Sequence, residues 1–229
     1  MIKHLAIIPD GNRRWAQINK VSLMEGYAKG IEKIGQLLGW CKELNIETLT
    51  LWGFSTENFQ REQKEVSSLM KLFEIKFREA LTSKEIHENQ IRVKILGRKD
   101  LLTSKAQEFI QKLEEETSKY DKHNLNLLLC YGGRQEIVDA CNAIIEECKK
   151  GKLTKVDEST FQKYLYTNGM SDPDLIIRTS GEKRLSGLMP WQSSYSELYF
   201  SDKFWPDFKK EDLVQALTEY ENRKRRFGR

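Results

Sequence analysis

The amino-acid sequence predicts a single α/β domain over residues 1–229, built on a mainly parallel sheet of about six strands flanked by helices. Two observations predict this fold class. Short apolar runs alternate with longer segments of helical period, and the runs are apolar at consecutive positions rather than at every second one. Strands of a parallel sheet are covered on both faces and show this pattern. No Pro/Ser-rich linker, internal repeat or low-complexity tract divides the chain.

The predicted strands are short, and several of them stop at a residue that interrupts a sheet. The first is a compact apolar run that stops at Pro9, and the second is rich in Thr, Leu and Trp. The third stops at Gly97 and the fourth at Gly132. The six predicted strands are His4 to Ile8, Glu47 to Phe54, Ile91 to Leu96, Leu125 to Tyr131, Leu175 to Ile177 and Glu197 to Phe200.

Between the strands, apolar residues recur every three or four positions, which is typical of helices that pack one face on a sheet. Strands that alternate with helices indicate right-handed βαβ units. The predicted helices lie around Ile31 to Cys41, Val66 to Phe77, Lys105 to Lys119, Arg134 to Lys150, Ser159 to Tyr166 and Lys209 to Asn222.

Composition and charge exclude several classes of protein. With 39% hydrophobic and 31% charged residues, the chain is not of the disordered type. Its net charge of +4 is too small for a general nucleic-acid binder. No apolar run reaches the roughly 18 residues of a membrane span, and Leu5 to Ile8 is too short for a secretory signal. The four cysteines form no CxxC pair, so we expect a cytoplasmic protein with buried thiols.

Charged residues stand next to several predicted strands. Because the carboxyl ends of parallel strands meet at one edge of a sheet, where ligands bind, we expect two acids and several arginines to converge there. These residues are Asp10, Arg13 and Arg14 after the first strand, Arg61 after the second, Arg178 and Arg184 after the fifth, and Glu197 at the start of the sixth.

The residue types at this edge indicate a site for a diphosphate and Mg²⁺. Arginine presents a planar fork of donors that suits phosphate oxygens, and a Gly11-Asn12 turn entering a helix offers backbone N–H groups to an anion. Carboxylates bind Mg²⁺, which often completes its coordination with substrate phosphates. The nucleotide motifs GxxxxGK[ST] and GxGxxG, the nucleophile motif GxSxG and zinc-ligand spacing of histidines are all absent.

The segment from His4 to Ala16 closely resembles the opening motif of the cis-prenyltransferases, the undecaprenyl diphosphate synthase family. The DDxxD motif of the all-helical trans-prenyltransferases is absent. Segments similar to the family's other motifs follow in order over nearly the whole chain: 54–58, 131–134, 174–182, 184–186, 191–192, 197–200 and 205–208.

The resemblance implies an enzyme that condenses isopentenyl diphosphate with an allylic diphosphate, usually farnesyl diphosphate, and makes each new double bond cis. The reaction would require Mg²⁺. The product would be a long-chain, undecaprenyl-type polyprenyl diphosphate, the lipid carrier of cell-wall glycan synthesis. The enzyme would be a cytoplasmic homodimer that contacts the membrane surface to release its product.

The resemblance also implies roles for individual residues. Asp10 would be the central catalytic residue and would hold Mg²⁺ together with Glu197. Asn58 matches a residue often assigned to the loss of the proton; because an amide is a poor base, we expect it to position that step. The implied substrate-binding residues are Gly11, Asn12, Arg13, Arg14 and Trp15 for the allylic diphosphate, Ser55, Thr56, Glu57 and Arg61 on a loop that closes over the substrates, and Arg178, Arg184, Leu185 and Ser186 for isopentenyl diphosphate.

A growing prenyl chain needs an apolar tunnel whose wall would set product length. The residues predicted to line it are Val66, Leu69, Met70, Phe73 and Phe77 on one helical stripe, with Leu127 and Leu129 on a strand, although the stripe is equally typical of a plain core. The chain also departs from the family. Arg13 replaces a common Gly, and Leu23 and Tyr27 stand where Arg and His are common, so the allylic primer and the product length stay open.

Other interpretations stay open at this point. The protein could be a short-chain or irregular prenyl diphosphate synthase, or a non-catalytic partner subunit, although such subunits typically lack the acid found here at position 10. Asp10 could be a helix N-cap, Arg178 and Arg184 surface ion-pair partners, and Glu197 a solvated strand residue. The segment Arg226-Phe227-Gly228 could be a solvated helix end, a nucleic-acid patch, or a tail that reaches the partner subunit's isopentenyl diphosphate site.

Overall fold

The computed structural model describes residues 2–223 and confirms the predicted parallel sheet. Six strands lie in the order β3-β4-β2-β1-β5-β6, and every neighbouring pair is parallel. Each predicted strand is present within two residues of its expected bounds. The strands are β1 (His4–Ile8), β2 (Thr48–Ser55), β3 (Ile91–Leu96), β4 (His123–Tyr131), β5 (Leu175–Arg178) and β6 (Glu197–Phe200).

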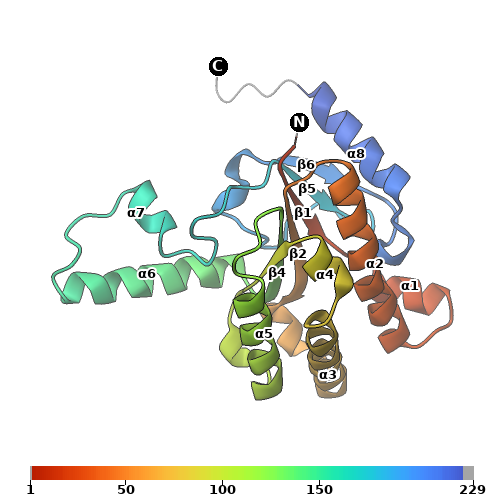
Figure 1. The fold of residues 1–229 in the computed structure, drawn as a ribbon, viewed down its shortest axis with the longest axis horizontal. Helices are drawn as coiled ribbons and strands as arrows, with labels where there is room; N and C mark the ends of the chain where they lie inside the picture. Colours follow the sequence, from red (N-terminus) through yellow and green to blue (C-terminus); the bar gives the residue numbers. More distant parts are fainter. Residues whose placement is uncertain (1, 224–229) are drawn as a thin grey trace.

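The α-helices and short 3-10 helices fill the connections between the strands (Figure 1). The α-helices are α1 (Asn12–Ile18), α2 (Leu23–Glu43), α3 (Gln63–Ala80), α4 (Lys84–Glu88), α5 (Ser104–Glu116), α6 (Gly133–Lys149), α7 (Glu158–Gln162) and α8 (Lys210–Asn222). The 3-10 helices are η1 (Thr56–Gln60), η2 (Lys99–Leu101), η3 (Gln192–Tyr195) and η4 (Trp205–Asp207). None of the helices within residues 2–223 is long and apolar enough to cross a membrane.

The two faces of the sheet are covered differently. Leu5 and Ile7 of β1 point into a large core that includes buried residues of α2, α3, α5 and α8. Ala6 and Ile8, which alternate with them, point to the opposite face. There they pack with Leu188 and other residues of the chain between α7 and β6. Figure 1 shows α6 extending away from the sheet toward α7.

Helix α2 begins earlier than the apolar stripe predicts. Ser22 caps its first turn, because its hydroxyl accepts a hydrogen bond from the backbone N–H of Glu25 while the Glu25 carboxylate accepts one from the N–H of Ser22. This reciprocal capping box extends the helix back to Leu23. The extension carries Tyr27 to the carboxyl edge of the sheet, where it joins the site described below.

The cysteine prediction is only half right. Cys41 and Cys130 are buried, and burial raises the pKa of each thiol to about 12. Cys141 and Cys148 are exposed on α6. Sequence alone did not show that this helix projects from the sheet.

A buried carboxylate fixes the carboxyl end of β4 to the segment that follows α7. Glu136 of α6 is fully buried and accepts hydrogen bonds from the Tyr131 hydroxyl (2.6 Å), the backbone N–H of Tyr166 (3.0 Å) and the side-chain amide of Gln192. Burial raises the pKa of Glu136, and the hydrogen bonds only partly oppose that rise. This network positions the loops next to the site.

The raised pKa of Glu136 predicts a pH-dependent stability difference. A carboxyl group whose folded-state pKa is raised stabilises the fold most below its unfolded pKa, and that contribution disappears as the pH rises through the folded pKa. We therefore expect the free energy of unfolding of wild type, relative to the Glu136→Gln variant, to fall as the pH rises above about 4.5. Urea titrations of both proteins at several pH values measure this difference. If the difference in free energy of unfolding stayed constant over this pH range, the raised pKa of Glu136 would be contradicted.

Candidate active site

The centre of the site is an ion pair between neighbouring strands. Asp10 follows β1, and Arg178 is the last residue of β5, which lies beside β1 in parallel register. Arg178 donates to Asp10 Oδ2 at 2.8 Å. The same guanidinium donates to Ser186 Oγ at 2.7 Å and to the carbonyl of Arg184 at 2.6 Å. The pair thus ties the loop around Ser186 to the end of β1.

Gly11 makes the turn from β1 into α1 possible. Its φ of 104° is unfavourable for other residues, and a Cβ atom there would come within 2.6 Å of the Phe204 ring. Gly11, not Asp10, occupies the N-cap position of α1. The interpretation of Asp10 as a helix cap is therefore wrong, and its carboxylate faces the arginines instead.

Arg14 adds a second guanidinium to this cluster. It donates to Ser180 Oγ at 2.6 Å and to Glu182 Oε1 at 3.1 Å, and its Nη2 lies 3.4 Å from Asp10 Oδ1. Its guanidinium also lies 5.6 Å from the centre of the Phe204 ring. Because these contacts hold Arg14 in place, it is preorganised for an anion.

The arginines control the ionisation of Asp10. Burial alone would raise the pKa of Asp10, but the hydrogen bond from Arg178 and the charges of Arg178 and Arg14 outweigh it and lower the pKa below its usual value. Asp10 is therefore a carboxylate at neutral pH. The ion-paired group of Asp10, Glu182, Arg14, Arg178 and Arg184 carries two negative and three positive charges, so it retains an excess of positive charge.

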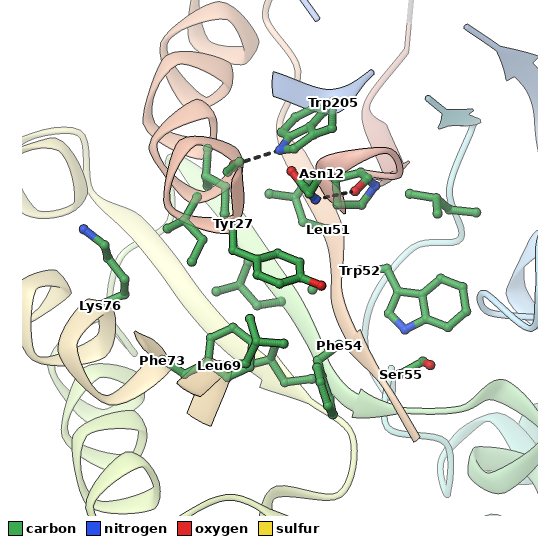
Figure 2. A pocket seen from close by; sticks show the side chains of 18 of the residues that line it. Asn12, Tyr27, Leu51, Trp52, Phe54, Ser55, Leu69, Phe73, Lys76 and Trp205 are labelled. Atoms are coloured by element: carbon green, nitrogen blue, oxygen red, sulfur yellow. Dashed lines mark hydrogen bonds between the residues drawn. The ribbon is translucent and has the colours of Figure 1, made fainter. Parts of the chain in front are cut away.

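A cavity of about 1330 Å³ opens at this cluster and extends between the sheet, α2 and α3. Figure 2 shows Asn12 and Ser55 near its polar end and Leu69 and Phe73 along its apolar wall. The predicted site residues that line it are Asp10, Gly11, Asn12, Arg13, Arg14, Ser55, Glu57, Asn58, Arg61, Arg178 and Ser186.

The predicted apolar lining is partly confirmed. Leu69, Phe73 and Phe77 of α3 line the cavity, as do the strand residues Leu127 and Leu129. Two further members of the α3 stripe, Val66 and Met70, are not among the lining residues and pack within the core instead. A single helical stripe therefore serves both core and cavity.

A second polar group at the mouth centres on Glu65 of α3, whose side chain is 8% exposed. Its carboxylate accepts a hydrogen bond from the Tyr27 hydroxyl at 2.7 Å and pairs with Arg61 at 3.2 Å and Arg13 at 3.6 Å. Arg61 also donates to the Tyr27 hydroxyl at 2.9 Å. The sequence pattern predicts the two arginines as site residues but not Glu65, because an acid within an amphipathic stripe gives no distinct signal.

Ser55 and Asn58 lie on a defined turn rather than a loose loop. Ser55 ends β2, and the segment after it forms the 3-10 helix η1. The side-chain oxygen of Asn58 accepts a hydrogen bond from the backbone N–H of Ser55 at 3.1 Å. This contact holds the Asn58 amide at the cavity mouth.

Four predicted substrate-binding residues do not line the cavity. Trp15 donates to Asp207 at 2.8 Å, and Thr56 packs beside Gly132. The exposed Arg184 side chain pairs with Glu182, so Arg184 contributes only its carbonyl to Arg178. Leu185 packs on the core at the second face of the sheet.

The prediction that Glu197 shares the edge with Asp10 is wrong within one chain. Glu197 is the first residue of β6 and lies opposite Leu175, at the amino end of β5. The carboxyl end of β6 is three residues further on, about 10 Å away. Glu197 Oε2 instead accepts a hydrogen bond from Arg223 at 2.9 Å. Glu197 stands at the start of its strand, as predicted, and the start of a parallel strand lies at the opposite edge of the sheet from the end of its neighbour. The tail segment 226–228 lies outside the described residues.

The residues present fit a Mg²⁺ ion held through one carboxylate. Among residues 2–223, no three His, Cys, Asp or Glu side chains are grouped to hold a metal. Asp10 is ionised and lines the cavity. Mg²⁺ often binds one or two carboxylates and takes its remaining ligands from water and substrate phosphates. Asp10 can therefore serve as the protein ligand of a substrate-bound Mg²⁺.

The fold and the site together define a prenyltransferase, an enzyme that acts on a diphosphate joined to an apolar chain. A family model described as "Putative undecaprenyl diphosphate synthase" matches residues 8–228. The chain therefore belongs to the undecaprenyl diphosphate synthase family, the cis-prenyltransferases.

Curated relatives and solved structures agree with this assignment. The chain is 47% identical to a tritrans,polycis-undecaprenyl-diphosphate synthase (geranylgeranyl-diphosphate specific) of Pyrococcus horikoshii, over 99% of this chain and 87% of the relative. It is 44% identical to the enzyme of the same name from Thermoplasma acidophilum, over 99% of this chain and 89% of that relative. Lavandulyl diphosphate synthase of Lavandula x intermedia, solved with dimethylallyl diphosphate, matches with a TM-score of 0.93 and 36% identity, over 100% and 98% of the two chains.

The ion pair at the centre of the site predicts the effect of removing one charge. We expect Asp10→Asn to lower kcat/KM for prenyl transfer at least about 100-fold, because the charge balance of the arginines changes and a Mg²⁺ ion held by Asp10 would lose its carboxylate ligand. Steady-state incorporation of isopentenyl diphosphate measures the loss. The exposed residue Asp121, which precedes β4, supplies the control variant Asp121→Asn. Near-wild-type turnover by a folded Asp10→Asn protein would refute the catalytic role of Asp10.

Proposed function

We propose that this enzyme extends an allylic diphosphate with isopentenyl diphosphate units in a Mg²⁺-dependent reaction and makes a long, undecaprenyl-type polyprenyl diphosphate. The observation that carries the proposal is the joining of an arginine–carboxylate cluster to a large apolar cavity. The arginine–carboxylate cluster suits a diphosphate, and the apolar cavity suits the hydrocarbon chain attached to it.

The primer we propose is geranylgeranyl diphosphate rather than the farnesyl diphosphate expected from the family resemblance. The relatives that are 44–47% identical over nearly the whole chain carry names that specify geranylgeranyl diphosphate. The departures at Leu23 and Tyr27 support a primer site that differs from the common family pattern.

In this proposal the protein residues hold and orient the two diphosphates. Arg14 and Arg178 donate to phosphate oxygens and stabilise the negative charge that develops as the allylic carbon–oxygen bond breaks. The leaving diphosphate takes the electron pair, and the double bond of isopentenyl diphosphate forms the new carbon–carbon bond. The cation formed in this way then loses a proton to the released diphosphate, which restores a double bond, and Asn58 positions this transfer. Mg²⁺, when bound, supplies further positive charge next to Asp10.

We further propose a cytoplasmic homodimer that works at the membrane surface, because the product is a lipid. The apolar residues Val138 and Ile145 are half-exposed on α6 and offer a surface for a second subunit. The intact Asp10–Arg178 pair supports a catalytic chain over a non-catalytic partner subunit.

Assays with the purified chain test the function directly. Labelled isopentenyl diphosphate and Mg²⁺ are combined with dimethylallyl, geranyl, farnesyl or geranylgeranyl diphosphate, and the products are sized. We expect geranylgeranyl diphosphate to give a kcat/KM at least about tenfold above that of farnesyl diphosphate. A chelator should abolish the incorporation. No product with any primer would contradict the catalytic assignment, and a single short product would favour a short-chain synthase.

Tyr27 gives a more specific prediction. Its hydroxyl accepts a hydrogen bond from Arg61 and donates one to Glu65, so Tyr27→Phe removes two contacts that position Arg61. A hydrogen bond of about 1 kcal/mol corresponds to a roughly fivefold change. We expect KM for the allylic diphosphate to rise by about that factor while kcat changes little. Tyr164→Phe, outside the cavity, is the control. An unchanged KM would show that Tyr27 does not position Arg61 for substrate.

A further inference from the structure

The turn that joins α1 to α2, residues 17–24, exposes a group of apolar side chains. Ile18, the last residue of α1, is 66% exposed, more than any other large aliphatic side chain among residues 2–223. Val21 follows three residues later and is 37% exposed, and Leu23 and Met24 at the start of α2 are half-buried. A single exposed apolar residue is ordinary, but a group on one short stretch indicates an interaction surface.

The backbone of the α1–α2 turn favours glycine at a position that a lysine occupies. The N–H of Lys20 donates to the Gln17 carbonyl at 3.2 Å, and the N–H of Val21 donates to the Ala16 carbonyl at 3.0 Å. In this helix ending the residue after the cap is left-handed and usually glycine. Lys20 has a φ of 56°, which costs a residue with a Cβ atom more than glycine. Lys20 is exposed, and its ammonium has no hydrogen-bond or ion-pair partner among residues 2–223.

The turn adds positive charge next to the cavity mouth. Arg13 and Gln17 of α1 line the cavity, and the turn begins at Gln17. Between residues 11 and 24 the chain carries Arg13, Arg14 and Lys20 and no acidic residue. The two arginines pair with acids of other segments, so Lys20 supplies the unpaired charge. Figure 1 shows α1 at the edge of the molecule, on the opposite side from α6.

We propose that the α1–α2 turn is the surface through which the enzyme binds an anionic lipid bilayer, an inference that rests on the proposed function and its lipid product. Ile18 and Val21 insert into the interfacial layer of the bilayer, and the Lys20 ammonium binds lipid phosphates. Leu23, where the family commonly has Arg, extends the apolar part of the surface. The cavity mouth then lies against the bilayer, so the hydrocarbon chain of the product passes into lipid with little exposure to water.

Variants of the apolar residues test insertion into the bilayer. The protein is sedimented with phosphatidylcholine vesicles that contain roughly 30% phosphatidylglycerol, an anionic lipid. We expect Ile18→Ser to lower the partition coefficient at least about tenfold and Val21→Ser at least about threefold, because each variant loses apolar area that the bilayer buries. Val156→Ser is the matched control, because Val156 is a 43% exposed valine in the loop before α7 and should leave binding unchanged.

Two substitutions at Lys20 separate its charge from a structural role. Lys20→Gln should weaken binding to the anionic vesicles about fivefold and leave the weaker binding to pure phosphatidylcholine vesicles unchanged. Lys119→Gln, in the exposed turn after α5, is the control. Lys20→Gly should raise the melting temperature, because glycine adopts a positive φ readily, and should still weaken vesicle binding. A purely structural role of Lys20 would change the melting temperature alone.

The outcomes separate this surface from the function on which it rests. If the wild type elongates a primer but does not sediment with the anionic vesicles, the surface alone is overturned. Vesicle binding without elongation of any primer supports the surface and contradicts the proposed function. Wild-type vesicle binding by both Ile18→Ser and Lys20→Gln overturns the surface. If Ile18→Ser instead dissociates a dimer in size-exclusion chromatography and still binds vesicles, a second copy of the chain covers the turn and the bilayer assignment is wrong.

Elongation in detergent solution provides the last control. None of Ile18, Lys20 and Val21 lines the cavity, so all their variants should elongate at wild-type rates when detergent replaces the vesicles. A variant with reduced elongation in detergent would have its side chain in the substrate site, and its role in membrane binding would be overturned.

Discussion

The site depends on one buried contact, the ion pair between Asp10 and Arg178. The side chain of Arg178 is 6% exposed, and its charge is costly to bury unless it is paired and hydrogen-bonded. The parallel register of β1 and β5 provides the partner, because it places the end of one strand beside the end of the other. The same guanidinium fixes Ser186 and the carbonyl of Arg184. Strand pairing, loop position and the ionisation of Asp10 are thus linked through a single side chain.

Two different physical environments meet at this pair. On one side, preorganised donors and an excess of positive charge suit an anion. On the other, the sheet and the helices α2 and α3 enclose an apolar cavity. The network of Glu65, Tyr27 and Arg61 joins the two helices at the boundary. An amphiphilic molecule with an anionic head can therefore bind in only one orientation, with its reactive end at Asp10.

Sequence reasoning predicted the sheet and the polar edge because both follow from local patterns. Apolar runs predicted the strands, and residues at or just after the ends of strands, such as Arg178 and Asp10, were placed correctly. The predictions were wrong for side chains whose position depends on more than the strand next to them in the sequence. Glu197, at the start of β6, lies at the opposite edge of the sheet from Asp10, and Trp15 turns away from the cavity toward Asp207. Glu65 was missed because it lies within a helical stripe, and only the partnership with Tyr27 makes it part of the site.

The cavity also affects the protein when no substrate is bound. The side chains that line the cavity of about 1330 Å³ make fewer van der Waals contacts than the side chains of a filled core. Any long-chain anion that enters, such as a fatty acid or an anionic detergent, regains some of that contact and raises the melting temperature in proportion to its affinity and concentration. Preparations of this protein should therefore retain amphiphiles from the host cell. Compounds with an acidic head and a rigid apolar tail should block it without resembling a phosphate ester.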